Sequence, residues 1–376
     1  MTTRSAKLLS AVHAQPGVTR AEAARLVGVG TGATTELVGR LSQAGLLTEA
    51  PAPASGLRGR PTTVLLPHPD GPLVAAVLIT HEIWRVDVVE LGGGVLDTVR
   101  AEHQGADGGR DGADVVADLA AAVRMLERDY AGRLRGLGLA APGIVHGLRL
   151  EAPSLQWHDL DLAPVAGELA IVVTGNDATM AASAESWRGA AVSGQVALHV
   201  RIEAGLGGAV VDGDRVLVGA SGAAGEFGHM PFGDPGVRCV CGAFGCWGTA
   251  VDGSALARLL GDPVPRDAIS YARRVITAAE PGSRELTAVL ETAGALGRGL
   301  AGLVTAFDPD VVTIGGLGRE ILDIAGGSVE QAYRAGLMQY RRDTSPALTA
   351  ARFGDDGPLV GAAEETWSRV IDQVLA

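Results

Sequence analysis

The chain has 376 residues and a net charge of −12 at pH 7, and 47% of its residues are hydrophobic although only 4% are aromatic. This length exceeds the size at which one hydrophobic core stops growing, so we expect two or three domains, and the composition excludes a disordered protein. The apolar runs, such as residues 73–80 and 311–316, are too short to cross a bilayer, so we expect no membrane partner.

Charge is distributed unevenly along the chain. Residues 1–70 contain seven basic and four acidic side chains, a net charge of +3, whereas the remaining residues contain 24 basic and 39 acidic ones, a net charge of −15. A mildly basic head on an acidic body is typical of a DNA-contacting module attached to a sensor.

Apolar periodicity predicts three short helices in the first seventy residues, at 5–14, about 20–28 and 31–44. Thr19 and Glu22 have the spacing of a capping box, which marks the start of the second helix. In the third helix Leu37, Val38 and Leu41 share the inward face. The residues expected to point outward are Thr31, Gly32, Thr34, Thr35 and Arg40.

Two short helices joined by a glycine turn follow the helix-turn-helix plan, in which the second helix presents its first residues to base edges. The segment Arg58-Gly59-Arg60-Pro61, followed by a strand-like run at 62–66, predicts a β-wing whose arginines suit phosphates or a narrow minor groove. The predicted contacts to double-stranded DNA are Arg20, Thr31, Gly32, Thr34, Thr35, Arg58 and Arg60. The alternative is a small helical protein-interaction domain with a solvated arginine pair.

Beyond Pro67 the chain alternates strands with helices. Strands are expected at 73–80, 85–91 and 137–140, with a helix at 115–130, and glycine turns punctuate the remainder. This alternation predicts an α/β fold.

The cysteines are concentrated in one place. Cys239, Cys241 and Cys246 are the only cysteines in the chain, and His229 precedes them in a His-x9-Cys-x-Cys-x4-Cys string. One imidazole and three thiolates fill a tetrahedral zinc shell and leave no open position, so we expect a structural Zn²⁺ site. The alternative is a reduced, metal-free cluster or a redox pair. With no further cysteine, a disulfide framework is excluded and a reducing cytoplasm fits.

Several motifs occur in one order along the body. They are Gly138-Leu-Ala-Ala-Pro142-Gly143, Ala152-Pro-Ser154-Leu, Asn176-Asp177, Gly225-Glu226-Phe-Gly-His229 and the cysteine string. Together with Gly59-Arg60-Pro61 in the head, they resemble the ROK family, named for repressors, open reading frames and kinases, over essentially the whole chain.

The resemblance implies an α/β, actin-like body of two lobes, of the sugar-kinase type, behind an N-terminal winged helix-turn-helix. The expected domains are 1–70 for the winged helix, 71–185 for the first lobe, completed by a C-terminal helix at about 355–376, and 186–354 for the second lobe with the zinc loop. It further implies a cytoplasmic repressor that binds operator DNA as a homodimer or tetramer and responds to a sugar.

The phosphate-binding parts of the family's kinases look dismantled. Asp177 falls where the kinases carry their catalytic base, but residues 78–82 retain none of the first phosphate loop, and the second loop, at 203–208, begins with Glu203. An acidic side chain would oppose a phosphate, and removing single stabilising donors already costs roughly 10² to 10³ in rate. We therefore expect no enzyme activity, with Asp177 as a relic of the base.

The sugar-binding pattern is partly retained. The resemblance assigns ligand contacts to Asn176, Asp177, Glu226, His229 and Ser154, the last in place of an asparagine, while Gly248 replaces a family glutamate. Such a site should bind the usual hexose less well, or take a different, bulkier or anionic compound. The alternative is that these polar groups only satisfy buried backbone. Gly30-Thr31 also replaces the usual Ser-Arg at the recognition helix, which leaves the operator sequence open.

The main hypothesis is thus a DNA-binding regulator whose operator affinity responds to a carbohydrate effector. The alternatives are a sugar kinase with atypical phosphate loops, a regulator that needs no ligand, and a zinc-stabilised protein scaffold that ignores DNA.

Overall fold

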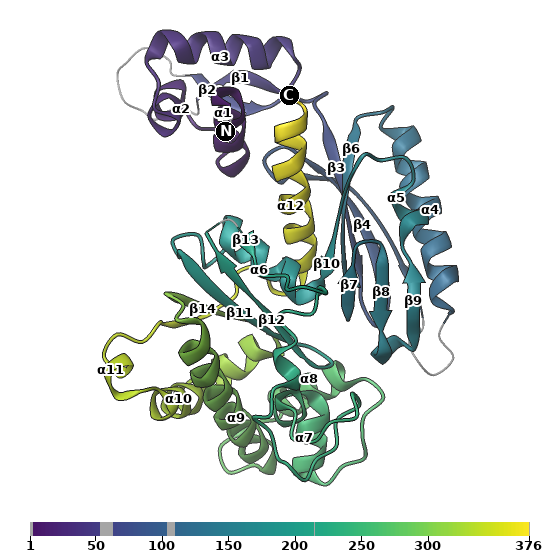
Figure 1. The fold of residues 1–376 in the computed structure, drawn as a ribbon, viewed down its shortest axis with the longest axis vertical. Helices are drawn as coiled ribbons and strands as arrows, with labels where there is room; N and C mark the ends of the chain where they lie inside the picture. The colour runs from purple at the N-terminus through teal and green to yellow at the C-terminus, as the bar shows by residue number, and fades with distance from the viewer. Residues whose placement is uncertain (1–2, 53–62, 104–109, 214, 376) are drawn as a thin grey trace. The chain divides into compact units, whose positions relative to one another are not determined.

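The computed structural model describes residues 3–52, 63–103, 110–213 and 215–375, which fold into two compact units (Figure 1). The first unit comprises Met1–Asn176 and Ala362–Ala376, and the second comprises Asp177–Gly361. The sequence predicts a first lobe that extends to residue 185, but the helix at 177–188 belongs to the second unit. It packs on two strands of the second sheet. The winged helix and the first lobe form one unit.

The head contains the three expected helices and a two-stranded antiparallel wing. The elements are α1 (Arg4–Ala14), α2 (Arg20–Val27), α3 (Thr31–Gln43), β1 (Leu47–Pro51) and β2 (Thr63–Pro67). The capping box is confirmed: the Thr19 side chain accepts from the Glu22 amide, and the Glu22 carboxylate accepts from the Thr19 amide. Residues 17–19 also hydrogen-bond to β2, so the wing is held against the helices.

The first lobe is built on a five-stranded sheet in the order β10-β6-β3-β4-β5. Its strands are β3 (Leu73–Ile79), β4 (Ile83–Glu90), β5 (Val95–Glu102), β6 (Leu134–Ala141) and β10 (Ile171–Asn176). β3, β6 and β10 run parallel, whereas β4 and β5 form antiparallel hairpins. A smaller sheet of β7 (Ile144–His146), β8 (Arg149–Ala152) and β9 (Trp157–Asp161) follows, with the 3-10 turn η1 (Pro153–Leu155) before β9.

Helices cover both faces of this first sheet. α4 (Gly112–Asp129) and α5 (Ala163–Ala166) lie on one side, and α12 (Gly357–Gln373) lies on the other (Figure 1). α12 approaches β6 closely: a Cβ at Gly138 would come within 2.2 Å of the Ala362 carbonyl oxygen. Position 138 therefore requires glycine for the C-terminal helix to dock on the lobe.

The second unit repeats this plan with a sheet in the order β13-β12-β11-β14-β15. Its strands are β11 (Val196–Ile202), β12 (Leu206–Asp212), β13 (Arg215–Val216), β14 (Val311–Gly316) and β15 (Leu348–Ala350). Its helices are α6 (Asp177–Arg188), α7 (Gly253–Leu260), α8 (Ala268–Thr277), α9 (Arg284–Phe307), α10 (Leu317–Gly336) and α11 (Gln339–Arg342), with 3-10 turns η2 (Phe227–His229), η3 (Trp247–Ala250) and η4 (Gly354–Asp356).

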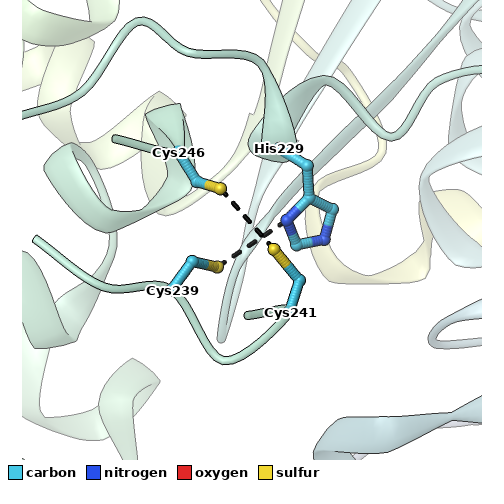
Figure 2. A group of neighbouring side chains, drawn as sticks. All are labelled: His229, Cys239, Cys241 and Cys246. Carbon is cyan, nitrogen blue, oxygen red and sulfur yellow. Dashed lines mark hydrogen bonds between the residues drawn. The ribbon is translucent and has the colours of Figure 1, made fainter. Parts of the chain in front are cut away.

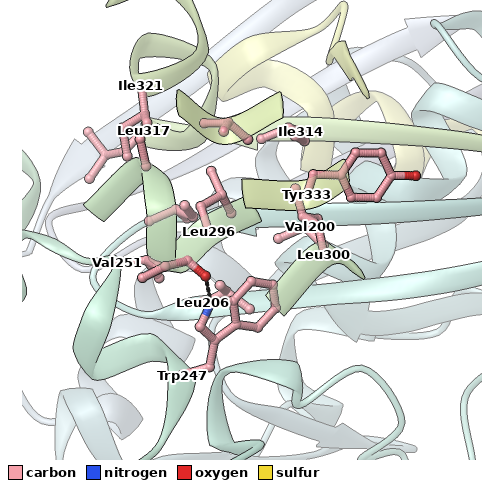
Figure 3. Packing of buried hydrophobic residues seen from close by; sticks show 14 of the residues in the cluster. Val200, Leu206, Trp247, Val251, Leu296, Leu300, Ile314, Leu317, Ile321 and Tyr333 are labelled. Atoms are coloured by element: carbon pink, nitrogen blue, oxygen red, sulfur yellow. Dashed lines mark hydrogen bonds between the residues drawn. The ribbon is translucent and has the colours of Figure 1, made fainter. Parts of the chain in front are cut away.

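The core of the second unit lies between its sheet and α9 and α10. Figure 3 shows Val200 and Ile314 of the sheet packed with Leu296 and Leu300 of α9 and with Trp247, all fully buried. The predicted α/β class is confirmed in both units. Within the described part of the chain, no helix combines the length and apolar character that a membrane span needs.

Candidate functional site

The four predicted metal ligands converge in the second unit. The donor atoms of His229, Cys239, Cys241 and Cys246 all lie within 4.8 Å of one another (Figure 2). Cys241 Sγ lies 3.7 Å from Cys246 Sγ, and Cys239 Sγ lies 3.7 Å from His229 Nδ1. A tetrahedron of thiolates about 2.3 Å from a zinc ion has edges of about 3.8 Å, so the spacing fits Zn²⁺.

The backbone of the cysteine loop is folded back on itself. The Cys239 amide donates to the Ala243 carbonyl at 2.8 Å, and the Gly242 amide donates to the Cys239 carbonyl at 3.0 Å. Gly242 adopts φ +94°, a left-handed conformation that disfavours residues with a side chain. This reversal brings cysteines that are close in sequence to one point.

The chemistry of the donor set also favours a metal. Burial, together with hydrogen bonds and charge from the two neighbouring thiols, raises the pKa of the Cys246 thiol to about 12. The Cys241 thiol shifts the other way, because hydrogen bonds, first of all the one to the Ala243 backbone, lower its pKa. Thiolates this close together repel one another, and a bound cation would offset that repulsion. His229, Cys239, Cys241 and Cys246 would hold the ion, which would lock the loop without an open coordination position.

His229 connects the cluster of candidate ligands to a carboxylate. Its Nδ1 faces the thiols, while its Nε2 lies 3.6 Å from Oε2 of Glu226. Burial raises the pKa of the Glu226 carboxyl, opposed by His229 and reinforced by Asp177. A carboxylate beside the second ring nitrogen orients a metal-bound imidazole, so occupancy of the metal site would also fix Glu226.

The first unit contributes the candidate ligand residues Asn176 and Ser154. Asn176 Nδ2 donates to the Gly143 carbonyl at 2.8 Å at the end of β10. Ser154 lies in η1, exposed, and its Oγ is 2.9 Å from Nε2 of His81. His81 was missed from the sequence because its segment resembles only a lost phosphate loop. A hydroxyl and an imidazole at this point could both bond a polar ligand.

Asp177, the first residue of α6, belongs to the second unit. Its Oδ1 accepts a hydrogen bond of 2.8 Å from the Ala178 amide. The helix dipole favours negative charge at the amino end of a helix, where this carboxylate lies. Glu226 and His229 belong to the same unit, whereas Asn176 ends the first one.

The first phosphate-loop segment forms a closed β-turn between β3 and β4. The Thr80 hydroxyl donates to the Ile83 carbonyl at 3.1 Å and accepts from the amides of Glu82 and Ile83. The only hydroxyl of residues 78–82 is therefore used inside the turn.

The second phosphate-loop segment forms the turn between β11 and β12, and a salt bridge joins Glu203 to Arg201. Arg201 is only 5% exposed, and it also donates to the Gly354 carbonyl at 2.8 Å. Burial is the main cause that raises the pKa of the Glu203 carboxyl. Sequence reasoning identified Glu203 but missed Arg201, because the pairing of a buried strand residue with the turn is visible only in the fold.

On α3, Thr31, Gly32 and Thr35 are exposed as predicted, but the prediction for Thr34 is wrong. Thr34 is 1% exposed, and its hydroxyl donates to the Gly30 carbonyl at 3.1 Å. Position 34 precedes Leu37 by one helical turn, so it lies on the inward face and cannot contact DNA.

The remaining predicted DNA contacts are arginines. Arg20 begins α2, and its guanidinium forms a two-bond ion pair with Glu49 of β1, which braces the helix against the wing. Its role at a phosphate remains a prediction. Arg58 and Arg60 lie outside the described residues.

The three-helix head with its wing, and two α/β units of which the second carries the cysteine loop, define an actin-like body of the sugar-kinase type with an N-terminal helix-turn-helix head. The chain belongs to the ROK family, whose model matches residues 102–366. The family resemblance of the sequence motifs is thereby confirmed.

Relatives of this chain include both kinases and repressors. A glucokinase of Halalkalibacterium halodurans is 29% identical over 247 residues, which cover 61% of this chain and 74% of the glucokinase. A putative xylose repressor of Caldicellulosiruptor sp. is 34% identical over 197 residues, which cover 48% of this chain and 49% of the repressor. The match thus spans about half of that repressor.

Among solved structures, a ROK family transcriptional regulator described as a homologue of the E. coli MLC protein superposes with a TM-score of 0.76 and 23% identity. The superposition covers 99% of this chain and 97% of that regulator, so the fold is shared over head and body.

Proposed function

We propose that the chain is a sequence-specific DNA-binding transcriptional regulator, a repressor whose operator affinity responds to a sugar or sugar-derived ligand held by a body without kinase activity. The observation that carries the proposal is the winged helix, whose third helix buries Leu37, Val38 and Leu41 and leaves the opposite face exposed. In a helix-turn-helix, that face enters the major groove.

The outward face of α3 has two glycines that the fold does not require. Gly32 and Gly39 lie one turn before and after Glu36, and a Cβ at either glycine would have no atom within 4 Å. Glycine inside a helix costs about 1 kcal/mol relative to alanine, so these positions destabilise the head without a packing reason. Close approach of a nucleic-acid groove to the helix backbone supplies that reason.

An effector role rests on polar residues that the chain retains from the family's sugar-binding pattern. Asn176, Asp177, Glu226 and His229 supply an amide, two carboxylates and an imidazole, the groups that bond sugar hydroxyls. Gly248 provides no side chain where family members bind sugar through a glutamate, and Ser154 is shorter than asparagine. We infer an effector other than the family's usual hexose, with Zn²⁺ as a structural ion.

The direct test is a mobility-shift assay with DNA fragments from upstream of the chain's own gene, at several salt concentrations. We expect a retarded band whose affinity falls with salt. Changing Arg58 or Arg60 to alanine should weaken binding and reduce the salt slope by about one, and changing the surface residue Arg128 on α4 provides a matched control. Absence of any shift at low salt would favour a zinc-stabilised scaffold.

The kinase alternative is supported by Asp177 and by the glucokinase relatives. A coupled assay with ATP and a panel of hexoses decides it: we expect no turnover above background, because Glu203 with its Arg201 partner occupies the phosphate-loop turn. Turnover that disappears in Asp177→Asn would overturn the regulator proposal in favour of an enzyme.

We further propose a homodimer or tetramer, because a two-fold operator requires two heads in symmetric positions. Light scattering coupled to size exclusion measures the mass directly. A monomer at the concentrations that bind DNA would contradict this part of the proposal.

A further inference from the structure

A buried histidine joins the winged helix to the first lobe. His13, near the end of α1, is 5% exposed, and its Nε2 lies 2.9 Å from Oε2 of Glu364 on α12. Glu364 is 3% exposed and is separated from His13 by 351 residues along the chain. The contact therefore links the DNA-binding head to the C-terminal helix of the body.

The second ring nitrogen of His13 is also used. The Gly92 amide, in the turn between β4 and β5, donates to His13 Nδ1 at 2.8 Å. Because Nδ1 accepts, Nε2 is the ring nitrogen that donates to Glu364. The indole of Trp367, one turn beyond Glu364, lies 5.5 Å from the imidazole, centroid to centroid. One side chain thus bonds two separate elements of the first lobe.

The β4–β5 turn also packs closely against the head. Gly92 has φ +96°, and a Cβ there would lie 2.8 Å from Cγ of Pro16 and 3.2 Å from Cγ of Pro67. Pro16 follows α1, and Pro67 ends the wing strand β2. The turn is therefore held between two parts of the head, and only glycine permits this approach.

The linker between head and lobe is held by a third contact. Arg133 Nε donates to the Gly71 carbonyl at 2.9 Å, and its NH2 group donates to the Pro69 carbonyl at 2.7 Å. The His68 amide donates to the Leu46 carbonyl just after α3. The linker at residues 68–71 is thus hydrogen-bonded to the first lobe through Arg133 and to the segment that follows α3 through Leu46.

We propose that His13 is a positioning residue: through Glu364 and Gly92 it holds the head in one orientation on the first lobe, so that any displacement of the lobe carries α3 with it. This inference rests on the proposed DNA-binding function. An apolar contact would stabilise the same junction but would allow the head to shift along the lobe. Two directional hydrogen bonds instead define one orientation of the head. The bonds therefore set where the two heads of a dimer reach the operator.

The test compares operator spacing preferences of full-length chains. Duplexes carrying two copies of the selected half-site, with zero to six added base pairs between them, are titrated with the wild type and variants. We expect the wild type to prefer one spacing by at least tenfold, and the double variant His13→Leu with Glu364→Leu to lose about tenfold of that preference. Affinity for a single half-site should not change, because α3 is untouched.

Two further variants separate positioning from simple stability. His13→Gln keeps a donor near the Nε2 position and should retain most of the spacing preference. Val12→Ala, in the same helix and fully buried, should lower the melting temperature of the head without altering the preferred spacing.

An unchanged spacing preference in the double variant would overturn the inference while leaving the regulator proposal intact. Loss of spacing preference in Val12→Ala as well would also overturn it, because destabilisation alone would then suffice. Failure of the wild type to bind any duplex would instead refute the proposed function itself.

Discussion

The indole N–H of Trp247 donates a hydrogen bond to the carbonyl of Ala295, 3.0 Å away, and so fastens the end of the cysteine loop to α9 (Figure 3). Trp247 follows the last candidate ligand, Cys246, and is fully buried. The loop is therefore continuous with the core of the second unit. If the loop became disordered, the packing of that core would be disturbed as well.

Zinc removal should consequently destabilise the second unit. We expect about one zinc per chain by elemental mass spectrometry and a fall in the free energy of unfolding of at least about 3 kcal/mol after chelation, a fraction of the roughly 10 kcal/mol seen in zinc-finger peptides. Cys246→Ser should reproduce the loss, and chelator should then have no further effect. A purified chain free of zinc, with a melting temperature that chelator leaves unchanged, would contradict the assignment.

Gly32→Ala should separate the stability of the head from DNA affinity. Nothing lies within 4 Å of the added methyl group, so the head should gain about 1 kcal/mol from helix propensity. The methyl would meet the groove, so affinity for the operator should fall about tenfold or more. Gly327→Ala on α10, also open within 4 Å, provides a matched control that should leave DNA affinity unchanged. Equal affinities for Gly32→Ala and wild type would show that α3 does not approach DNA there.

Much of the fold could be predicted from local patterns. The capping box at Thr19 and Glu22 located α2, and apolar runs located β3 and β4, because propensity and periodicity act over a few residues. The cluster of candidate metal ligands could be predicted from residue type and spacing. Thr34 was misplaced because a threonine near a helix start fits either face, and packing against the remainder of the head decides.

Long-range pairings could not be predicted in the same way. His13 and Glu364 are 351 residues apart, and neither has a local sequence signal that selects the other. Arg201 is a strand residue that pairs with the adjoining turn, and it also donates to the Gly354 carbonyl of η4, 153 residues later in the chain. Such contacts are set by how the elements pack, which composition and periodicity do not specify.

Asp252 should make stability depend on pH in weak acid. It caps α7 by accepting from the Ala255 amide at 2.8 Å, and burial raises its carboxyl pKa from 3.8 to about 6. Between those values the folded chain holds a proton that the unfolded chain has lost, so this contribution to stability falls as pH rises and is smallest above pH 6. Asp252→Asn keeps the cap without the charge.

We therefore expect Asp252→Asn to be more stable than wild type by about 1–3 kcal/mol at pH 7.5, with the difference shrinking at pH 5. Urea unfolding at the two pH values measures it, and Asp252→Ala, which lacks the cap, should be less stable than Asp252→Asn at both. A wild-type chain more stable than Asp252→Asn at pH 7.5 would contradict this prediction. It would mean that the folded protein stabilises the ionised carboxylate of Asp252.

His199 should make stability fall as the pH falls, opposite to the effect of Asp252, because the pKa of His199 is lowered. It is fully buried on β11, with Nδ1 2.8 Å from the Thr313 hydroxyl of the neighbouring strand, and burial, assisted by the charge of Arg201, lowers its pKa from 6.5 to about 3. Below the unfolded pKa the unfolded chain gains a proton that the folded chain excludes, so stability is lost as pH falls from 6.5 towards 3.

The expected loss from this group is about 1.4 kcal/mol per pH unit within that window. The double variant His199→Leu with Thr313→Val removes both polar partners together and leaves no orphaned hydroxyl, so it should fold with a much flatter dependence on acid. Urea midpoints of wild type and double variant at pH 7, 6 and 5 measure the difference in slope. Parallel curves for the two chains would show that His199 is already protonated in the fold, and the buried imidazole would then need a counter-charge that its neighbour Arg201 cannot supply.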